Sequence, residues 1–213
     1  MITLTTLKDV PPFAQGLVRD LRVRWALEEA EIPYETRLLV PGEHKSADFF
    51  ALQPFGQVPV IEADGLTLFE SGAIVLHIGR RSEQLLPADA NSRARAVAWV
   101  FSALNSIEPY IAQLVELDLF HSEEEWARLR RPSAEKNLVA RLDHLSTWLK
   151  GREWLEDDFT VGDLMMATVL RIPRHTDLVT GNATLGPYLA RCEDRPAFAR
   201  ALADHMAAHD KAA

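Results

Sequence analysis

The spacing of hydrophobic and polar positions in the first part of the chain alternates between strand-like and helix-like segments. Residues 2–7, a run of β-branched and aliphatic residues, predict a strand. Residues 18–30 carry apolar side chains at helical spacing and precede Pro33, so they predict a helix that ends before this proline. Residues 34–40 predict a second strand, which gives the order β-α-β.

A second group of elements follows after a connector. Residues 58–62 and 66–69 are predicted strands, and the sequence ADG between them is typical of a β-hairpin turn. Ser71 then opens a predicted helix whose apolar residues continue to Ile78. A β-α-β unit has parallel strands joined by a right-handed crossover, and a hairpin adds antiparallel strands, so the pattern predicts a small mixed sheet.

The remainder of the chain has a helical pattern. Residues 82–92 interrupt the periodicity and predict a linker, and from Arg93 onward apolar residues recur at helical spacing. We therefore expect an α/β domain at residues 1–81 and an all-helical domain at residues 93–213. Within the second domain, helices are predicted near residues 123–131, 134–149, 162–172 and 196–208, with a capping box formed by Thr160 and Asp163.

The composition is that of an ordinary globular protein and narrows the range of partners. Of the 213 residues, 47% are hydrophobic and 25% are charged, and 31 acidic residues against 23 basic ones give a net charge of −8. This balance argues against binding to nucleic acid or to an anionic membrane surface. We expect no membrane span, because no apolar run approaches the roughly 20 residues that cross a bilayer, and no signal peptide.

Cysteine usage excludes several kinds of chemistry. Cys192 is the only cysteine, so the chain cannot form an intramolecular disulfide, a CxxC redox pair or a cysteine-rich metal site. We expect a reduced, cytoplasmic protein without a metal, in which Cys192 is a passive thiol.

An unusual proline opens the third predicted strand. Proline cannot donate a hydrogen bond to a sheet ladder, so Pro59, just inside an apolar run, indicates a special backbone geometry. If the Val58–Pro59 bond is cis, the Val58 backbone can present its N–H and C=O to an extended, peptide-like ligand that pairs as an extra strand. The alternative is an ordinary trans proline at a strand edge.

Two further groups of polar residues could recognise the charged ends of such a ligand. Ser71 lies where a strand ends and a helix begins, so a carboxylate would be attracted there, while Glu70 could hold an ammonium group. His44 and Lys45 could bind a second carboxylate. The alternatives are that Ser71 only caps the helix and that the other pair lies in a solvated loop. Together, a zwitterion site, a backbone edge and a second carboxylate site describe glutathione.

The stretches GEHKS, QPFGQVPV and LTLFES resemble motifs of the glutathione transferase superfamily, most closely those of its phi-like and related bacterial members. ALEEAEIPYE, FTVGDLMMA and LLPAD add independent matches, so the resemblance extends over nearly the whole chain. It implies a thioredoxin-like N-terminal domain of the type β-α-β-β-β-α followed by an all-helical domain.

The resemblance also implies which residues bind glutathione. His44 and Lys45 would meet the glycine carboxylate, and Gln57 would support the same end of the ligand. Val58 would pair with the cysteinyl backbone beside a cis Pro59.

At the opposite end of the ligand, the resemblance implies that Glu70 and Ser71 hold the γ-glutamyl group. Phe55 would act as a hydrophobic key that inserts into a partner subunit, which implies a homodimer. The alternative for Phe55 is an ordinary core phenylalanine.

The chain departs from the family between the first strand and the first helix. Members place a Tyr, Ser or Cys there to stabilise or engage the glutathione sulfur, yet residues 8–21 contain none of the three. A free thiol has a pKa of about 8.5, so another group must favour the thiolate. N–H groups of a helix start near residues 16–18, Gln15 or the charge of Arg19 could do so. Arg19 is the candidate catalytic residue, and its alternative is a surface arginine.

Two functions fit these observations. The first is a glutathione transferase that transfers glutathione to a small hydrophobic electrophile, or uses glutathione to transform it, as in detoxification. The second is a non-catalytic glutathione-binding or protein-interaction module of the same fold. The absence of a Ser or Tyr hydroxyl from residues 8–21 favours this second function. A thiol reductase is disfavoured because residues 8–21 contain no cysteine.

Overall fold

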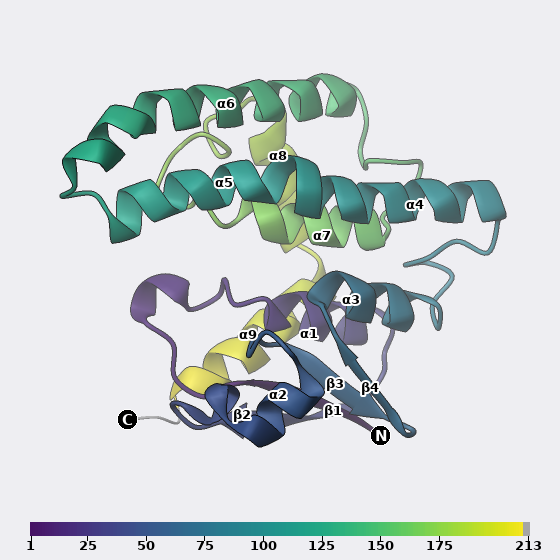
Figure 1. Cartoon of the computed structure of the whole chain (residues 1–213). Coiled ribbons are helices and arrows are strands. Elements are labelled where there is room, and N and C mark those ends of the chain that lie inside the picture. The colour runs from purple at the N-terminus through teal and green to yellow at the C-terminus, as the bar shows by residue number, and fades with distance from the viewer. Residues whose placement is uncertain (211–213) are drawn as a thin grey trace. The chain divides into compact units, whose positions relative to one another are not determined.

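The computed structural model of the chain describes residues 1–210 (Figure 1). Contacts divide it into two compact units, the first formed by Met1–Leu86 together with the residues from Asp194 onward and the second by Pro87–Glu193. The predicted class, an α/β unit at the N-terminus and a helical unit after it, is confirmed. Among the described residues, no helix combines the length and the apolar character needed to cross a bilayer.

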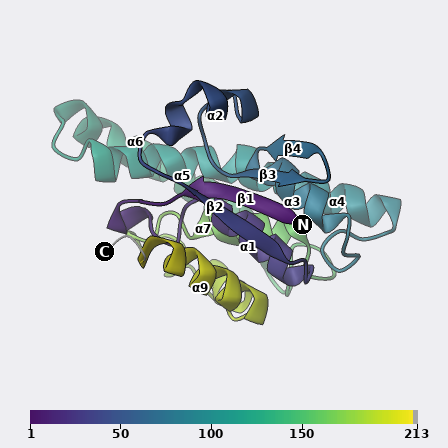
Figure 2. The same ribbon diagram turned by 90° about the horizontal axis from the view of Figure 1, so that it is seen from below.

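The sheet of the first unit has the strand order β2-β1-β3-β4 (Figure 2). The strands are β1 (Ile2–Leu7), β2 (Tyr34–Leu39), β3 (Val60–Ala63) and β4 (Leu66–Phe69). β1 and β2 are parallel, and β3 pairs antiparallel with both β1 and β4, which confirms the predicted mixed sheet. β3 begins at Val60 rather than at residue 58, since Pro59 has no N–H to donate to the ladder.

The helices of the first unit are α1 (Asp20–Glu29), α2 (Ala47–Leu52), α3 (Ser71–Gly79) and α9 (Pro196–Asp210). α1 and α3 were predicted, and α2 was not, because six residues are too few to show a helical period. The N-terminus of α2 is capped by Ser46, whose Oγ accepts a hydrogen bond from the N–H of Phe49 at 3.2 Å.

The last helix belongs to the first unit, whereas the sequence assigned residues 196–208 to the helical domain. α9 packs along α1 (Figure 2), and the rings of Trp25 and Phe198 meet edge-on with centroids 4.8 Å apart. The physical reason lies in α1, in which every residue from 20 to 27 is buried. A helix buried on all sides needs neighbours on all sides, and α9 supplies one of them in addition to α3.

A buried polar network joins α9 to α1 and to the loop before it. Nε2 of His205 accepts a hydrogen bond from the Gly16 N–H at 3.1 Å, so Nδ1 carries the proton that it shares with Asp20 Oδ2, also at 3.1 Å. Arg24 Nε donates to the same carboxylate oxygen at 2.9 Å. Burial alone would raise the pKa of Asp20, but the bond from His205 and the charge of Arg24 outweigh it and hold this pKa below its ordinary value.

The described part of the second unit is helical. It contains α4 (Ala90–Ser102), α5 (Glu108–Val115), α6 (Glu125–Leu149), α7 (Val161–Leu170) and α8 (Leu185–Glu193), with π-helical segments after α4 and α5. The capping box predicted for Thr160 and Asp163 is confirmed at the start of α7. α8 was not predicted, and it carries the buried Cys192.

The prediction of two helices at residues 123–131 and 134–149 is wrong. They form the single helix α6, which continues through Pro132. Proline inside a helix costs about 3 kcal/mol. Packing offsets this cost, because Ala127 before the proline and Ala134 after it are buried in the same hydrophobic cluster.

Candidate functional site

The strand ends bring the candidate residues to one end of the sheet. β1 and β2 end together, with Leu7 opposite Leu39. β3 runs the other way and therefore begins near this end, with Val60 opposite both Thr5 and Phe69. The loops that follow β1 and β2, the residues that precede β3 and the start of α3 after β4 consequently meet there.

A buried glutamine fixes the loop that leads to β3. The side chain of Gln53 is 2% exposed, and its Oε1 accepts hydrogen bonds from the N–H groups of Phe55 at 2.6 Å and Gln57 at 3.1 Å. A Cβ added to Gly56 would lie 2.9 Å from the carbonyl oxygen of His44, so only glycine fits this close approach. The loop before β3 is thereby held against the His44 loop.

His44 and Lys45 lie in a 3-10 turn, η2 (Glu43–Lys45). His44 is half-buried, and its Nδ1 is shielded from solvent without a hydrogen-bond partner among residues 1–210. Buried polar atoms normally have a partner, so a ligand group at this position would satisfy the nitrogen. Lys45 and Gln57 are exposed, and the binding of a carboxylate by these three side chains stays a prediction.

The Val58–Pro59 peptide bond is cis, as predicted. Pro59 is buried, and Val58 is partly buried against a cluster formed by Leu39, Phe49 and Val60. The ladder of β3 begins at Val60, so the Val58 backbone lies just outside the sheet at the end where the loops meet.

Glu70 and Ser71 lie at the same end of the β3–β4 hairpin as this backbone segment. Val60 pairs with Phe69, Val58 comes two residues before Val60, and Glu70 and Ser71 follow Phe69 directly. Glu70 is the N-cap residue of α3 and Ser71 is its first residue, so the alternative in which Ser71 only caps the helix is wrong. Glu70 has a φ of 69°, a conformation uncommon for glutamate, so its surroundings must hold it there.

A buried arginine that the sequence did not single out supports Ser71. Arg22 of α1 is 3% exposed, and its Nη1 donates a hydrogen bond to Ser71 Oγ over 3.2 Å. Its guanidinium adds positive charge beside the N-terminus of α3, where the helix dipole is also positive, and this combination suits a carboxylate.

Arg19, the predicted catalytic residue, is exposed and immediately precedes α1, and its role stays a prediction.

The loop between β1 and α1 corrects one expectation. α1 begins at Asp20 rather than near residues 16–18, because Gly16 adopts a φ of 76° that interrupts a helical path. The Gly16 N–H donates to His205 of α9, so it cannot serve as a donor to a ligand sulfur.

Phe55 is 66% exposed, so the alternative of a core phenylalanine is wrong. Its ring meets that of Phe69 edge-on, with centroids 6.4 Å apart.

Within residues 1–210, no three His, Cys, Asp or Glu side chains are grouped in a way that could hold a metal ion.

Comparison with known proteins finds relatives that match most of the chain. Residues 15–80 match the family model described as glutathione S-transferase, N-terminal domain. A glutathione S-transferase of Hyoscyamus muticus is 30% identical over 199 residues, which cover 85% of this chain and 92% of that relative. The glutathione S-transferase-like protein gedE of Aspergillus terreus is 30% identical over 143 residues, and the match spans 64% of this chain and 63% of the length of gedE.

A solved structure agrees with the sequence relatives. The glutathione transferase from Burkholderia graminis, solved with two glutathione molecules bound per subunit, is 27% identical, with a TM-score of 0.82 over 94% of this chain and 87% of that one. The first unit is therefore a thioredoxin-like domain, followed by a helical unit. The chain belongs to the glutathione S-transferase family.

Proposed function

We propose that the chain is a glutathione transferase, which binds glutathione where the strand ends meet and transfers it to a small hydrophobic electrophile. The observation that carries the proposal is that Val58, beside a cis proline, and Ser71, at the start of α3, lie at the same end of the β3–β4 hairpin. A free backbone edge next to a helix N-terminus suits a peptide that ends in a carboxylate. The bound glutathione molecules of the Burkholderia graminis relative support the same ligand for this chain.

Each part of glutathione has a partner in this proposal. The γ-glutamyl carboxylate accepts hydrogen bonds from Ser71 at the α3 N-terminus, with the Arg22 guanidinium behind it, and Glu70 faces the ammonium group. The cysteinyl backbone pairs with Val58. The glycine carboxylate is bound by His44, Lys45 and Gln57. The Nδ1 atom of His44, which has no hydrogen-bond partner among the described residues, supports a polar ligand group at this position.

The sulfur needs a group that favours the thiolate. Lowering a thiol pKa by about two units requires roughly 2.7 kcal/mol of preferential stabilisation of the thiolate. We assign this role to Arg19, a cation at the end of the loop that follows β1 and a candidate for direct contact with the sulfur. A second function, glutathione binding without conjugation, is favoured by the absence of Ser, Tyr and Cys from residues 8–21.

Replacing Arg19 by alanine tests this assignment. The thiol pKa of bound glutathione is expected to rise by about one unit, and kcat/KM for conjugation to fall about tenfold, because the thiolate loses its cation. Thiolate absorbance during a pH titration gives the pKa, and a panel of hydrophobic electrophiles gives the turnover.

The matched control is Arg80→Ala, which removes an exposed arginine just after α3. An Arg19→Ala protein with the wild-type thiol pKa and turnover would remove Arg19 as the activating group. A wild-type protein that binds glutathione without lowering its thiol pKa and without turnover would support the second function. Absence of glutathione binding would contradict both functions.

We also propose that the protein is a cytoplasmic homodimer in which Phe55 enters the partner subunit. An aromatic side chain that is 66% exposed is typical of an interface rather than of a free surface. Phe55→Ser is expected to raise the dissociation constant of the dimer at least about tenfold. An aromatic side chain that anchors an interface typically contributes about 2 kcal/mol or more to the binding free energy. Sedimentation equilibrium measures the effect, and Phe50→Ser, at another exposed phenylalanine of the first unit, is the control. An equally stable Phe55→Ser dimer would refute the key role.

A further inference from the structure

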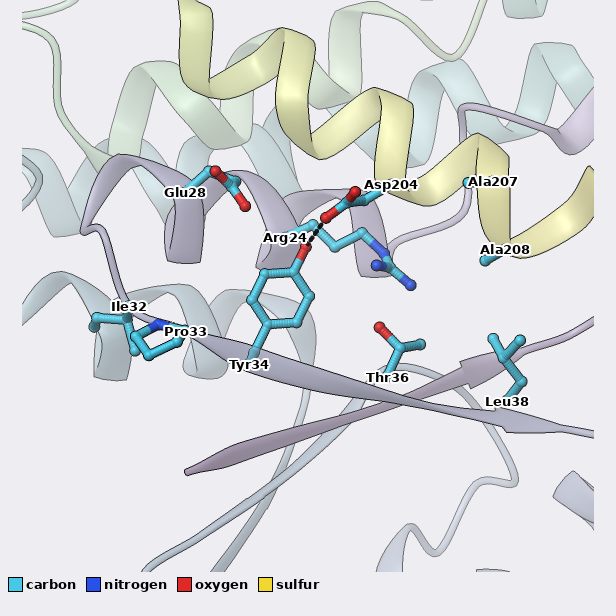
Figure 3. Close-up of a pocket in the computed structure, with 10 residues that line it drawn as sticks. All are labelled: Arg24, Glu28, Ile32, Pro33, Tyr34, Thr36, Leu38, Asp204, Ala207 and Ala208. Atoms are coloured by element: carbon cyan, nitrogen blue, oxygen red, sulfur yellow. Dashed lines mark hydrogen bonds between the residues drawn. The ribbon is translucent and has the colours of Figure 1, made fainter.

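A pocket of about 450 Å³ lies between β2, α1 and α9 of the first unit (Figure 3). It is lined by side chains of β2 that point away from the sheet toward α9, among them Tyr34 and Thr36. Its volume is within the range of small-molecule sites, about 300–1,000 Å³. None of the residues proposed to bind glutathione lines this pocket.

One wall of the pocket is the buried side chain of Arg24, whose charge is paired with Asp20 and whose guanidinium carbon lies 5.8 Å from the centre of the Tyr34 ring. The side chain of Arg24 is 2% exposed, and its Nε donates to Asp20. Its Nη2 is shielded from solvent and has no hydrogen-bond partner among residues 1–210. Figure 3 shows the guanidinium end of Arg24 directed toward Thr36, whose hydroxyl points back at it. An unpaired nitrogen on a buried guanidinium is costly, and a carboxylate oxygen would satisfy it.

The same pocket is lined by two carboxylates, those of Asp204 and Glu28. Asp204 of α9 accepts a hydrogen bond from the Tyr34 hydroxyl at 3.1 Å, and Glu28 of α1 pairs with Arg200 at 2.6 Å. Burial raises the pKa of Tyr34 to about 12, so the phenol keeps its proton and continues to donate to Asp204. Figure 3 shows Asp204 between Glu28 and the guanidinium of Arg24.

We propose that this pocket binds a free α-amino acid with an apolar side chain. The amino-acid carboxylate meets Arg24 and the Thr36 hydroxyl, and the ammonium group meets Asp204. The apolar side chain packs on Leu38, Ala207 and Ala208, which line the end of the cavity beyond Thr36.

The charges of the lining select this class of ligand. Arg24 places a positive side chain and Asp204 a negative one at the cavity, while Glu28 is already paired with Arg200. A simple anion would be repelled by the Asp204 carboxylate, and a simple amine would leave the Arg24 nitrogen unpaired. A zwitterion offers each group its opposite charge at once. The inference does not depend on the proposed glutathione activity, because the two sites share no residue.

Isothermal titration of the full chain with leucine, leucinamide and N-acetyl-leucine tests the proposal. Leucine is expected to bind saturably. Leucinamide lacks the carboxylate and N-acetyl-leucine lacks the ammonium group, so each is expected to bind at least about tenfold more weakly. Equal affinity for all three compounds, or no binding of leucine, would overturn the proposal.

Two variants and a control locate the binding. Thr36→Val and Asp204→Asn change exposed residues and are each expected to weaken leucine binding about tenfold, with unchanged thermal unfolding. Glu35→Gln, on the opposite face of β2, is expected to bind leucine as wild type does. Arg24→Gln is unsuited, because it also breaks the buried pair with Asp20.

Saturating glutathione separates this pocket from the proposed glutathione site. The leucine affinity is expected to stay unchanged when glutathione is present. Competition between the two ligands, or wild-type leucine affinity in both Thr36→Val and Asp204→Asn, would place the amino acid elsewhere and refute the proposed pocket.

Discussion

Ser71→Ala is expected to weaken glutathione binding about a hundredfold. The change removes the hydroxyl proposed to bind the γ-glutamyl carboxylate, and it also deprives the buried Arg22 of the oxygen that it contacts at 3.2 Å. Hydrogen bonds to charged groups contribute about 1.5–3 kcal/mol each, and about 2.7 kcal/mol corresponds to a hundredfold change in affinity. Isothermal titration with glutathione measures the loss directly.

A conservative variant separates recognition from folding. Ser71→Thr keeps a hydroxyl at the first position of α3, so its affinity is expected to stay within about threefold of wild type, a difference of less than 1 kcal/mol. Thermal unfolding shows whether either variant disturbs the first unit. Undiminished glutathione affinity in a folded Ser71→Ala protein would contradict the proposed position of the γ-glutamyl group.

Asp163→Ala is expected to destabilise the second unit by about 4 kcal/mol, since capping contributes about 1 kcal/mol and each buried group left unpaired costs about 1–3 kcal/mol. The Asp163 carboxylate is 0% exposed and accepts hydrogen bonds from the N–H groups of Leu155 and Thr160 and from the Tyr188 hydroxyl. Urea unfolding followed by circular dichroism measures the change. Thr160→Ser, which keeps the capping hydroxyl, is the control and is expected to lose less than about 1 kcal/mol.

The effect of Asp163→Ala is also expected to depend on pH. Burial raises the pKa of Asp163 above the ordinary 3.8, and the hydrogen bonds that it accepts only partly oppose this. A raised folded-state pKa contributes stability that is fully present below pH 3.8 and is lost as the pH rises through the folded value. The stability difference between wild type and variant should therefore shrink as the pH rises from the acid side, and an increase would contradict the direction of the shift.

Local patterns sufficed for most of the fold, and long-range packing accounts for the remainder. The strands of the first unit and its helices α1 and α3 follow from alternation, helical spacing and the hairpin turn, each of which is encoded within a few residues. The continuity of α6 through Pro132 depends on Ala127 and Ala134 sharing one buried cluster, which no local pattern reveals. The place of α9 depends in the same way on partners that are far away in the chain, such as Trp25 and Phe198.

In the candidate site, too, some features could be predicted from the sequence and others depend on long-range packing. The cis bond before Pro59 was implied by the resemblance of QPFGQVPV to glutathione transferase motifs, whereas the proline by itself indicated only a special backbone geometry. Arg22 and Gln53 were missed. Gln53 gave a signal, because it precedes a turn containing proline and glycine, whereas Arg22 is one of several charged residues in its helix. Their roles depend on burial, since Arg22 is 3% and Gln53 2% exposed, and burial is a property of the folded chain.

The position of α9 has a consequence for synthesis on the ribosome. Met1–Leu86 emerge first, but the face of α1 that carries Asp20 and Arg24 stays uncovered until the helical unit has been translated and α9 follows it. Domains generally fold as units during translation, so the thioredoxin-like unit is completed last although it begins first. A chain terminated early would expose an ion pair and an apolar helix face, and proteases remove such incompletely folded chains preferentially.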